Sequence, residues 1–155
     1  FLKGSKKIYQ KNLINKKIRE FVIGKKINKK NISQSLDFSN QSKKILLKKI
    51  KKLKLDNVKL IEGNFADTIP KFFKNYKNKI MCANIDSDLF ESYEISLPYV
   101  YKYLSKRGYI HLDEYYSLKF PGAKIACDNF LKKNKIKLRK NKSYNWEFER
   151  YYIKK

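Results

Sequence analysis

The sequence predicts an α/β fold in which a doubly wound, mostly parallel sheet ends in a C-terminal antiparallel hairpin. Residues 80–85 form a continuous apolar run of strand length, which is typical of a strand buried on both faces, and the shorter run 109–112 is expected to be a second buried strand. A segment of helical periodicity separates these two runs, as a crossover between parallel strands requires. Two further strands close the chain around a short polar loop, and this pattern is typical of a hairpin.

The first part of the chain predicts two basic helices and one strand. Ile14, Ile18, Phe21 and Val22 recur at helical spacing, so a helix is expected over residues 6–23, followed by a loop over 24–39. Five apolar side chains mark one face of a second, lysine-rich helix that starts at Ser42 and ends near Asp56 and Asn57, and they are Ile45, Leu46, Ile50, Leu53 and Leu55. A strand is expected over residues 58–61.

The second part alternates helices and strands more regularly. A turn after Glu62 leads into a short helix whose first amides Asp67 or Thr68 can cap. The remaining elements are expected over residues 80–85 (strand), 90–104 (helix), 109–112 (strand), 121–132 (helix), 135–138 (strand) and 146–153 (strand).

The length of 155 residues predicts a single domain, 1–155. Its first 39 residues contribute a basic helix and loop, and residues 40–155 contain the sheet.

The formal net charge of +24 has two explanations. Nucleic acid is the usual partner of such an excess, because Lys and Arg neutralise phosphates. The chain, however, holds 34 Lys against 4 Arg, and Ile and Asn, whose codons are also rich in A and T, are abundant as well. Phosphate recognition favours the bidentate Arg side chain, so codon composition explains most of the charge better, and nucleic acid is the less favoured partner.

The cysteines and the hydropathy pattern exclude other classes. Cys82 and Cys127 stand alone in apolar stretches, without a CxxC pair or a nearby His, so both are expected to be buried free thiols in a reducing cytosol. No apolar run approaches the roughly 20 residues of a membrane span, and the first residues do not form a signal peptide. A cytoplasmic protein without a membrane partner is expected.

Carboxylates follow the two apolar strands. Asp86 and Asp88 come directly after residues 80–85, and Asp113 and Glu114 come directly after 109–112. The carboxyl ends of neighbouring parallel strands lie close together, and carboxylates this close need a cation. An oxygen-only set favours Mg²⁺, Ca²⁺ or Mn²⁺ over zinc. The alternative is that Asp88 caps the following helix.

Four segments resemble the macrocin O-methyltransferase (TylF/MycF) family. They are GNFADTIP (63–70), NIDSDLFES (84–92), DEY (113–115) and PGAKIACDNF (121–130), and their order and spacing agree across residues 40–155. The resemblance implies S-adenosylmethionine- and divalent-metal-dependent methylation of sugar hydroxyls. It also implies a Rossmann-like sheet with strand order 3-2-1-4-5-7-6.

The resemblance also assigns roles to residues. Asp86, Asp113 and Glu114 become the metal ligands, with Mg²⁺ or another divalent cation bound, and Asp86 or Asp88 becomes the proton acceptor. The adenine side of the cofactor is expected to contact Asn64, Phe65 and Asp67. The acceptor pocket is expected to be lined by Tyr115 and Tyr116.

This sequence departs from the family at four points. The family commonly has His at the position of Asn84, Tyr at Phe90 and Asp at Glu114. Asn84 cannot act as a base, and His111 on the next strand is interpreted as a core or sheet-face residue. A Gly-rich turn for the methionine part of the cofactor is not found, so the fold is expected to be incomplete at its N-terminus.

The sequence therefore leaves more than one function open. The first is an O-methyltransferase, complete or truncated, that acts on a small-molecule acceptor such as a sugar or glycoside. Such an enzyme could form a homo-oligomer. The alternative is a basic nucleic-acid-binding module or RNA methyltransferase remnant, suggested by 19 basic against 3 acidic residues over positions 1–60. A degenerate gene product without activity is the third.

Overall fold

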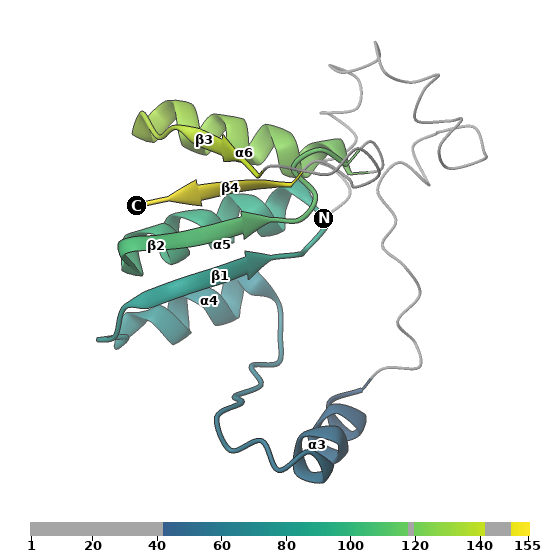
Figure 1. The fold of residues 1–155 in the computed structure, drawn as a ribbon. Helices are drawn as coiled ribbons and strands as arrows, with labels where there is room; N and C mark the ends of the chain where they lie inside the picture. The colour runs from purple at the N-terminus through teal and green to yellow at the C-terminus, as the bar shows by residue number, and fades with distance from the viewer. Residues whose placement is uncertain (1–41, 118–119, 142–149) are drawn as a thin grey trace, which may run out of the picture.

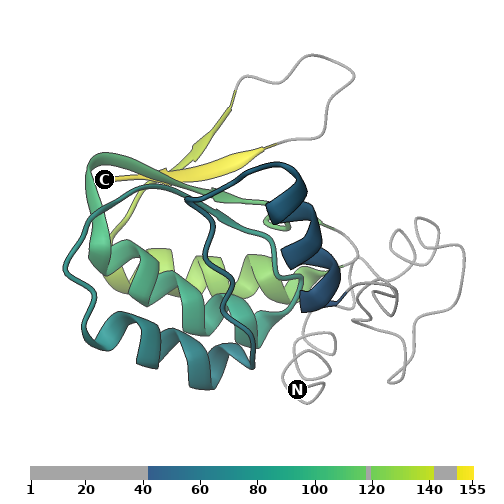
Figure 2. The same ribbon diagram turned by 90° about the horizontal axis from the view of Figure 1, so that it is seen from below.

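The computed structural model describes residues 42–117, 120–141 and 150–155. These residues form an α/β fold in which a four-stranded sheet carries three helices on one face (Figures 1 and 2). The elements in chain order are α3 (Lys43–Lys52), α4 (Phe65–Lys74), β1 (Ile80–Ile85), α5 (Phe90–Tyr103), β2 (Leu104–Leu112), α6 (Pro121–Asn134), β3 (Leu138–Lys140) and β4 (Tyr151–Lys154).

The strand order in the sheet is β1-β2-β4-β3. β1 and β2 are parallel and are joined by the crossover helix α5, whereas β2 with β4 and β3 with β4 are antiparallel. The predicted α/β class and the C-terminal antiparallel hairpin are confirmed, and the described sheet is mixed. Its order corresponds to the 4-5-7-6 part of the order that the resemblance implies.

One sequence prediction is wrong for the segment before α4. Residues 58–61 form no strand, and Val58 and Ile61 are 44% and 48% exposed. A strand exists only when a neighbour pairs its amides and carbonyls, and the part of the chain that the structure describes offers this segment no such neighbour. Apolar β-branched composition therefore did not suffice to make a strand here.

β1 is a strand with the predicted bounds, but it is not buried on both faces. It lies at the edge of the described sheet, and only one of its faces is covered by α5. Ile85 is buried and Ala83 packs against the core, whereas Cys82 is exposed. Alternate side chains of a strand point to opposite faces, which places Cys82 on the face away from the helices. Of the two cysteines, only Cys127 is buried as predicted.

The helices agree with the sequence prediction in type and differ at their ends. α3 ends at Lys52, earlier than expected, because the chain turns at Lys54, whose φ is +54°. None of its residues is buried. The amides of α4 are capped by Asn64 rather than by Asp67 or Thr68, since the Asn64 side chain accepts a hydrogen bond from the Ala66 N–H at 2.9 Å.

The later boundaries shift by a few residues. β2 begins at Leu104, directly after α5, so it is longer than the predicted strand 109–112. β3 starts later than predicted, at Leu138, and β4 spans Tyr151–Lys154, whereas positions 146–149 of the predicted last strand lie outside the described residues. The predicted helix over 6–23, the loop over 24–39 and the hairpin turn lie outside the described residues. Among the residues that are described, no helix is long and apolar enough to cross a membrane.

The hydrophobic core lies between the sheet and the helices α5 and α6. Its largest fully buried side chains come from both layers, and they are Tyr93, Leu97, Leu104, Ile110, Leu112, Ile153 and Cys127. Because these side chains bind α5 to β2 and β4, the core fixes the carboxyl ends of the parallel strands relative to the start of α5.

Leu97→Ala is expected to lower the free energy of unfolding by about 2–5 kcal/mol, because it leaves a cavity in a fully buried site. Urea unfolding followed by circular dichroism measures this change. Leu53→Ala, which truncates a side chain that is 66% exposed, is the matched control and should change the free energy by less than about 0.5 kcal/mol. Equal losses in the two variants would contradict the placement of the core.

Candidate active site at the carboxyl ends of β1 and β2

The acidic residues singled out in the sequence lie at one edge of the sheet. Asp86 and Asp88 follow β1, and Asp113 and Glu114 follow β2. Ile85 and Leu112 pair across the two parallel strands, and the Asp113 N–H donates to the Ile85 carbonyl at 3.1 Å. The sheet ladder thus continues one residue beyond β2 and holds the two acidic segments side by side.

Three of these carboxylates form a compact cluster. One oxygen each from Asp86, Asp88 and Glu114 lies within 4.8 Å of the others. Asp86 is exposed, Asp88 is partly buried and Glu114 is 4% exposed, so the cluster opens to solvent on one side. Carboxylate oxygens at such separations suit a hard divalent cation.

The backbone at Asp88 is strained. Its φ is +59°, a left-handed conformation that Asp tolerates better than most residues. α5 begins at Phe90 with Leu89 at the N-cap position, so Asp88 stands one residue outside the position from which a side chain caps a helix. The alternative interpretation of Asp88 as the cap of this helix is therefore not supported.

Tyr93, in the first turns of α5, holds Glu114 in place. The Tyr93 hydroxyl lies 2.5 Å from Glu114 Oε2 and 2.7 Å from the Ile85 carbonyl oxygen, and it accepts a hydrogen bond from the Glu114 N–H at 3.2 Å. The hydroxyl has one proton for two acceptors, the Glu114 carboxylate and the Ile85 carbonyl, and it donates to them. Burial, followed by the bond to Glu114, raises the pKa of Tyr93 well above its ordinary value.

The environment of Glu114 favours its protonated form. Burial raises the pKa of the Glu114 carboxyl from its ordinary 4.5 to about 7. The hydrogen bond with Tyr93 opposes this rise, whereas the negative charges of the three neighbouring aspartates add to it. A bound cation would lower the pKa of Glu114, because it favours the ionised carboxylate.

Asp113 has a different partner. Arg150 Nη1, directly before β4, donates to Asp113 Oδ1 at 3.1 Å. The ligand set predicted from the resemblance, Asp86, Asp113 and Glu114, thus shares two members with the cluster in the structure, in which Asp88 is the third. The predicted set stays a prediction.

Asn84 and His111 form a polar pair on the sheet. They are register partners on β1 and β2, and His111 Nδ1 lies 2.8 Å from Asn84 Oδ1. Because an amide oxygen only accepts, His111 carries its proton on Nδ1 in this arrangement. The His111 side chain is partly exposed on a face of the sheet, in agreement with its interpretation as a sheet-face residue.

The residues predicted to border the cofactor lie together at the start of α4. Asn64 caps the helix, and its carbonyl accepts a hydrogen bond from the Thr68 hydroxyl at 2.8 Å. Phe65 is 40% exposed and Asp67 is exposed in the first turn, so both side chains are accessible to a ligand.

The two tyrosines predicted for the acceptor pocket differ in environment. Tyr115 is buried, and its hydroxyl donates to Asp128 Oδ1 at 2.8 Å. Burial and the bond to Asp128 raise the pKa of Tyr115 well above its ordinary value. Tyr116 is 57% exposed and stacks on Tyr151 with a centroid separation of 6.0 Å. Of the pair, Tyr116 has the accessible ring.

Sequence reasoning missed two residues of this region, Tyr93 and Arg150. Arg150 carried a signal, because it is one of only 4 Arg in a chain with 34 Lys. Tyr93 carried none, since its position in a helical segment is equally typical of a core aromatic residue.

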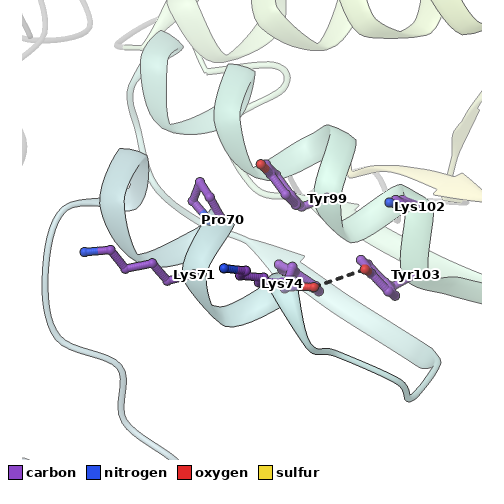
Figure 3. A pocket seen from close by; sticks show the side chains of 7 residues that line it. Pro70, Lys71, Lys74, Tyr99, Lys102 and Tyr103 are labelled. Carbon is purple, nitrogen blue, oxygen red and sulfur yellow. Dashed lines mark hydrogen bonds between the residues drawn. The ribbon is translucent and has the colours of Figure 1, made fainter.

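A hollow of about 350 Å³ between α4 and α5 lies apart from the acidic cluster (Figure 3). Its lining comes from the C-terminal parts of both helices, and it comprises Pro70, Lys71, Phe73, Lys74, Tyr99, Lys102 and Tyr103. Tyr103 stacks on Phe73 and donates to the Phe73 carbonyl at 3.1 Å. The helix dipole favours lysines near helix C-termini, which accounts for the three lysines that line this hollow. The hollow therefore gives no sign of a ligand site.

The raised pKa of Glu114 predicts how the stability of the metal-free protein depends on pH. Between about pH 4.5 and 7 the folded state binds more protons than the unfolded state, so the free energy of unfolding falls as the pH rises through this window. Urea unfolding at several pH values in EDTA measures the fall. Glu114→Gln should reduce the slope, and Glu94→Gln, at an exposed position on α5, should keep it. Parallel profiles for wild type and Glu114→Gln would contradict the prediction.

Comparison with solved structures finds methyltransferases. The crystal structure of the calicheamicin methyltransferase CalS11 has a TM-score of 0.52 and 28% identity, over 61% of this chain and 36% of that one. A structure of the same enzyme without ligand describes it as a TDP-rhamnose 3'-O-methyltransferase and gives a TM-score of 0.52 and 28% identity, over 61% of this chain and 40% of that one. The O-methyltransferase NovP, at 23% identity and a TM-score of 0.61 over 73% of this chain and 44% of that one, supports the fold alone.

The chain spans 36–44% of the length of these solved relatives. No curated protein sequence matches it. Residues 16–143, most of the chain, match a single family, which agrees with the resemblance of the four segments. This protein belongs to the Macrocin-O-methyltransferase (TylF) family.

Proposed function

We propose that this protein is an S-adenosylmethionine- and divalent-metal-dependent O-methyltransferase that acts on a hydroxyl of a sugar or glycoside. The observation that supports this most is the group of three carboxylates, Asp86, Asp88 and Glu114, at the carboxyl ends of two parallel strands in a TylF family member. This edge is where ligands bind in open α/β sheets. The likeness to CalS11, a TDP-rhamnose 3'-O-methyltransferase, supports the acceptor class.

The residues present fit a divalent cation. All donors are oxygens, which suits Mg²⁺ or Mn²⁺. Glu114 is a buried carboxylate whose pKa is raised, so a cation would relieve an unfavourable charge. In addition, the Ser87 hydroxyl, between Asp86 and Asp88, is buried without a hydrogen-bond partner among the described residues. Such a group is satisfied by a ligand or by a cation's water.

Asp86 and Glu114 would hold the cation, with Asp113 (from the resemblance) or Asp88 (from the cluster) as the third carboxylate. A divalent cation bound there supplies Lewis acidity, which lowers the pKa of a coordinated hydroxyl. The acceptor oxygen would form a bond to the methyl carbon as the bond from that carbon to the sulfonium sulfur breaks, which leaves S-adenosylhomocysteine, and Asp86 or Asp88 would accept the hydroxyl proton. Tyr93 keeps Glu114 fixed during this step, and Tyr116 would contact the acceptor.

The start of α4 would bind the adenosyl part of S-adenosylmethionine. Phe65 offers an accessible ring face to the adenine, and Asn64 fixes the turn that presents it. Asp67 would meet the polar edge of the adenosyl group.

Loss of the Asp86 carboxylate should abolish methyl transfer. With labelled S-adenosylmethionine and a nucleotide sugar as acceptor, Asp86→Asn is expected to lower kcat/KM more than about 100-fold, because it removes a cation ligand and a proton acceptor. EDTA should have a similar effect on the wild type. The control, Glu94→Gln, should keep full activity, and an active Asp86→Asn enzyme would exclude the proposed role.

Cofactor binding can be tested separately from catalysis. Phe65→Ala should weaken binding of S-adenosylmethionine about tenfold in calorimetric titration, because base stacking on an aromatic ring contributes about 1–3 kcal/mol. Tyr109→Ala removes a ring of similar exposure, 47%, from β2 and should leave the affinity unchanged. Equal affinities of the Phe65 variant and the wild type would contradict the placement of the adenine against Phe65.

A further inference from the structure

Three tyrosine rings pack in series beside the acidic cluster. Tyr115 and Tyr116 directly follow Glu114, and Tyr151 is the first residue of β4. The ring centroid of Tyr151 lies 4.8 Å from that of Tyr115 and 6.0 Å from that of Tyr116. The planes of Tyr116 and Tyr151 differ by only 26°, so these two rings are stacked. Tyr151 therefore contacts both a buried ring and an exposed ring.

Contacts with α6 and with the sheet fix the buried end of this series. The Tyr115 hydroxyl donates to Asp128 Oδ1 at 2.8 Å, and Lys124 Nζ donates to the other carboxylate oxygen of Asp128. Lys124 also lies over the Tyr115 ring, 4.9 Å from its centroid. Tyr151 packs against the core and pairs with Leu112 across the antiparallel strands. The ring on which Tyr116 stacks is thus held by the fold.

The exposed end of the series presents a ring face to solvent. Tyr116 is 57% exposed, and stacking on Tyr151 occupies one of its two faces. Exposed side chains exchange rotamers rapidly, and the contact with Tyr151 limits this exchange for Tyr116. The outer face of the Tyr116 ring is therefore preorganised for a ligand.

The position of Tyr116 in the chain indicates which part of an acceptor this face would contact. Tyr116 is two residues after Glu114, and two residues span at most about 7 Å. A hydroxyl that reacts at the acidic cluster therefore brings its own sugar ring, rather than a distant part of the acceptor, within reach of Tyr116. A pyranose presents C–H groups on its faces, which pack on an aromatic ring, and the tyrosine hydroxyl adds a polar contact.

We infer that Tyr116 and Tyr151 form the subsite for the sugar ring of the acceptor, in which Tyr116 contacts the sugar and Tyr151 is the residue that positions Tyr116. The inference rests on the proposed function and adds a residue to the site, since Tyr151 lies outside residues 16–143, which match the family. Tyr151 acts on the acceptor through Tyr116 and takes no part in cation binding or in the transfer of the methyl group.

Calorimetric titration of the full chain tests this subsite, with the nucleotide sugar used as acceptor above and with its free nucleoside diphosphate. Tyr116→Ala should bind the nucleotide sugar about threefold to tenfold more weakly, because the ring contact is lost. Tyr151→Ala should weaken binding by a similar factor, whereas Tyr151→Phe keeps the ring and should stay within about twofold of wild type. The affinity for the free nucleoside diphosphate, which lacks the acceptor sugar, should be the same in all of these proteins.

The double variant Tyr116→Ala/Tyr151→Ala separates a positioning role from an independent contact. If Tyr151 acts only through Tyr116, the double variant should lose no more affinity than Tyr116→Ala alone. Steady-state kinetics should place the loss in the KM of the acceptor, with kcat within about twofold of wild type, and Mn²⁺ affinity should not change. Tyr152→Ala is the matched control, because Tyr152 pairs with His111 and points to the opposite face of the sheet from Tyr151. It should change none of these quantities.

The outcomes are distinct. If Tyr151→Ala binds the nucleotide sugar as the wild type does, or if the two losses add in the double variant, Tyr151 does not position Tyr116 and the inference is wrong, while the proposed function stands. A parallel loss of Mn²⁺ affinity, of kcat or of affinity for the free nucleoside diphosphate would also overturn the inference, because the effect would then not be confined to the sugar. If the wild type neither binds the nucleotide sugar nor methylates it, the acceptor class of the proposed function and the inference are both overturned.

Discussion

The parallel pairing of β1 with β2 is the interaction on which the site depends. It places the end of one strand beside the end of the other, and the bond from the Asp113 amide to the Ile85 carbonyl carries the pairing past the last strand residue. The pairing also brings several carboxylates to one edge of the sheet, where their negative charges repel one another. Of the two carboxylates that follow β2, Glu114 accepts a hydrogen bond from Tyr93 and Asp113 accepts one from Arg150.

Tyr93 connects folding to the chemistry of the site. Its side chain is fully buried in the core, yet its hydroxyl contacts the last residue of β1 and the carboxylate of Glu114. The crossover helix is thereby fixed to both strands at the edge where they end. Glu, one methylene longer than the Asp that the family commonly has here, spans the distance to this hydroxyl while its oxygen remains in the acidic cluster.

Much of the fold was predictable because its signals are local. Apolar runs of strand length predicted β1 and β2, and helical periodicity predicted α5 between them. The acids after each strand predicted the edge that holds the site. Burial was harder to predict: residues 58–61 and Cys82 have apolar neighbours in sequence, but a strand needs a partner, and a buried face needs a layer above it. The partners of Asp113 and Glu114 depend on long-range contacts with Arg150 and Tyr93, which no local pattern encodes.

The order of the sheet makes β3 a dependent strand. β4 follows β3 in the chain but lies between β2 and β3, and within the described sheet β3 pairs with β4 alone. Proteolytic removal of residues 150–155 would therefore detach two strands at once and uncover the β2 edge at Ile110 and Leu112. It would also remove the guanidinium from Asp113. Loss of residues 150–155 would thus remove strand pairs of the sheet and the cationic partner of an acidic-site carboxylate together.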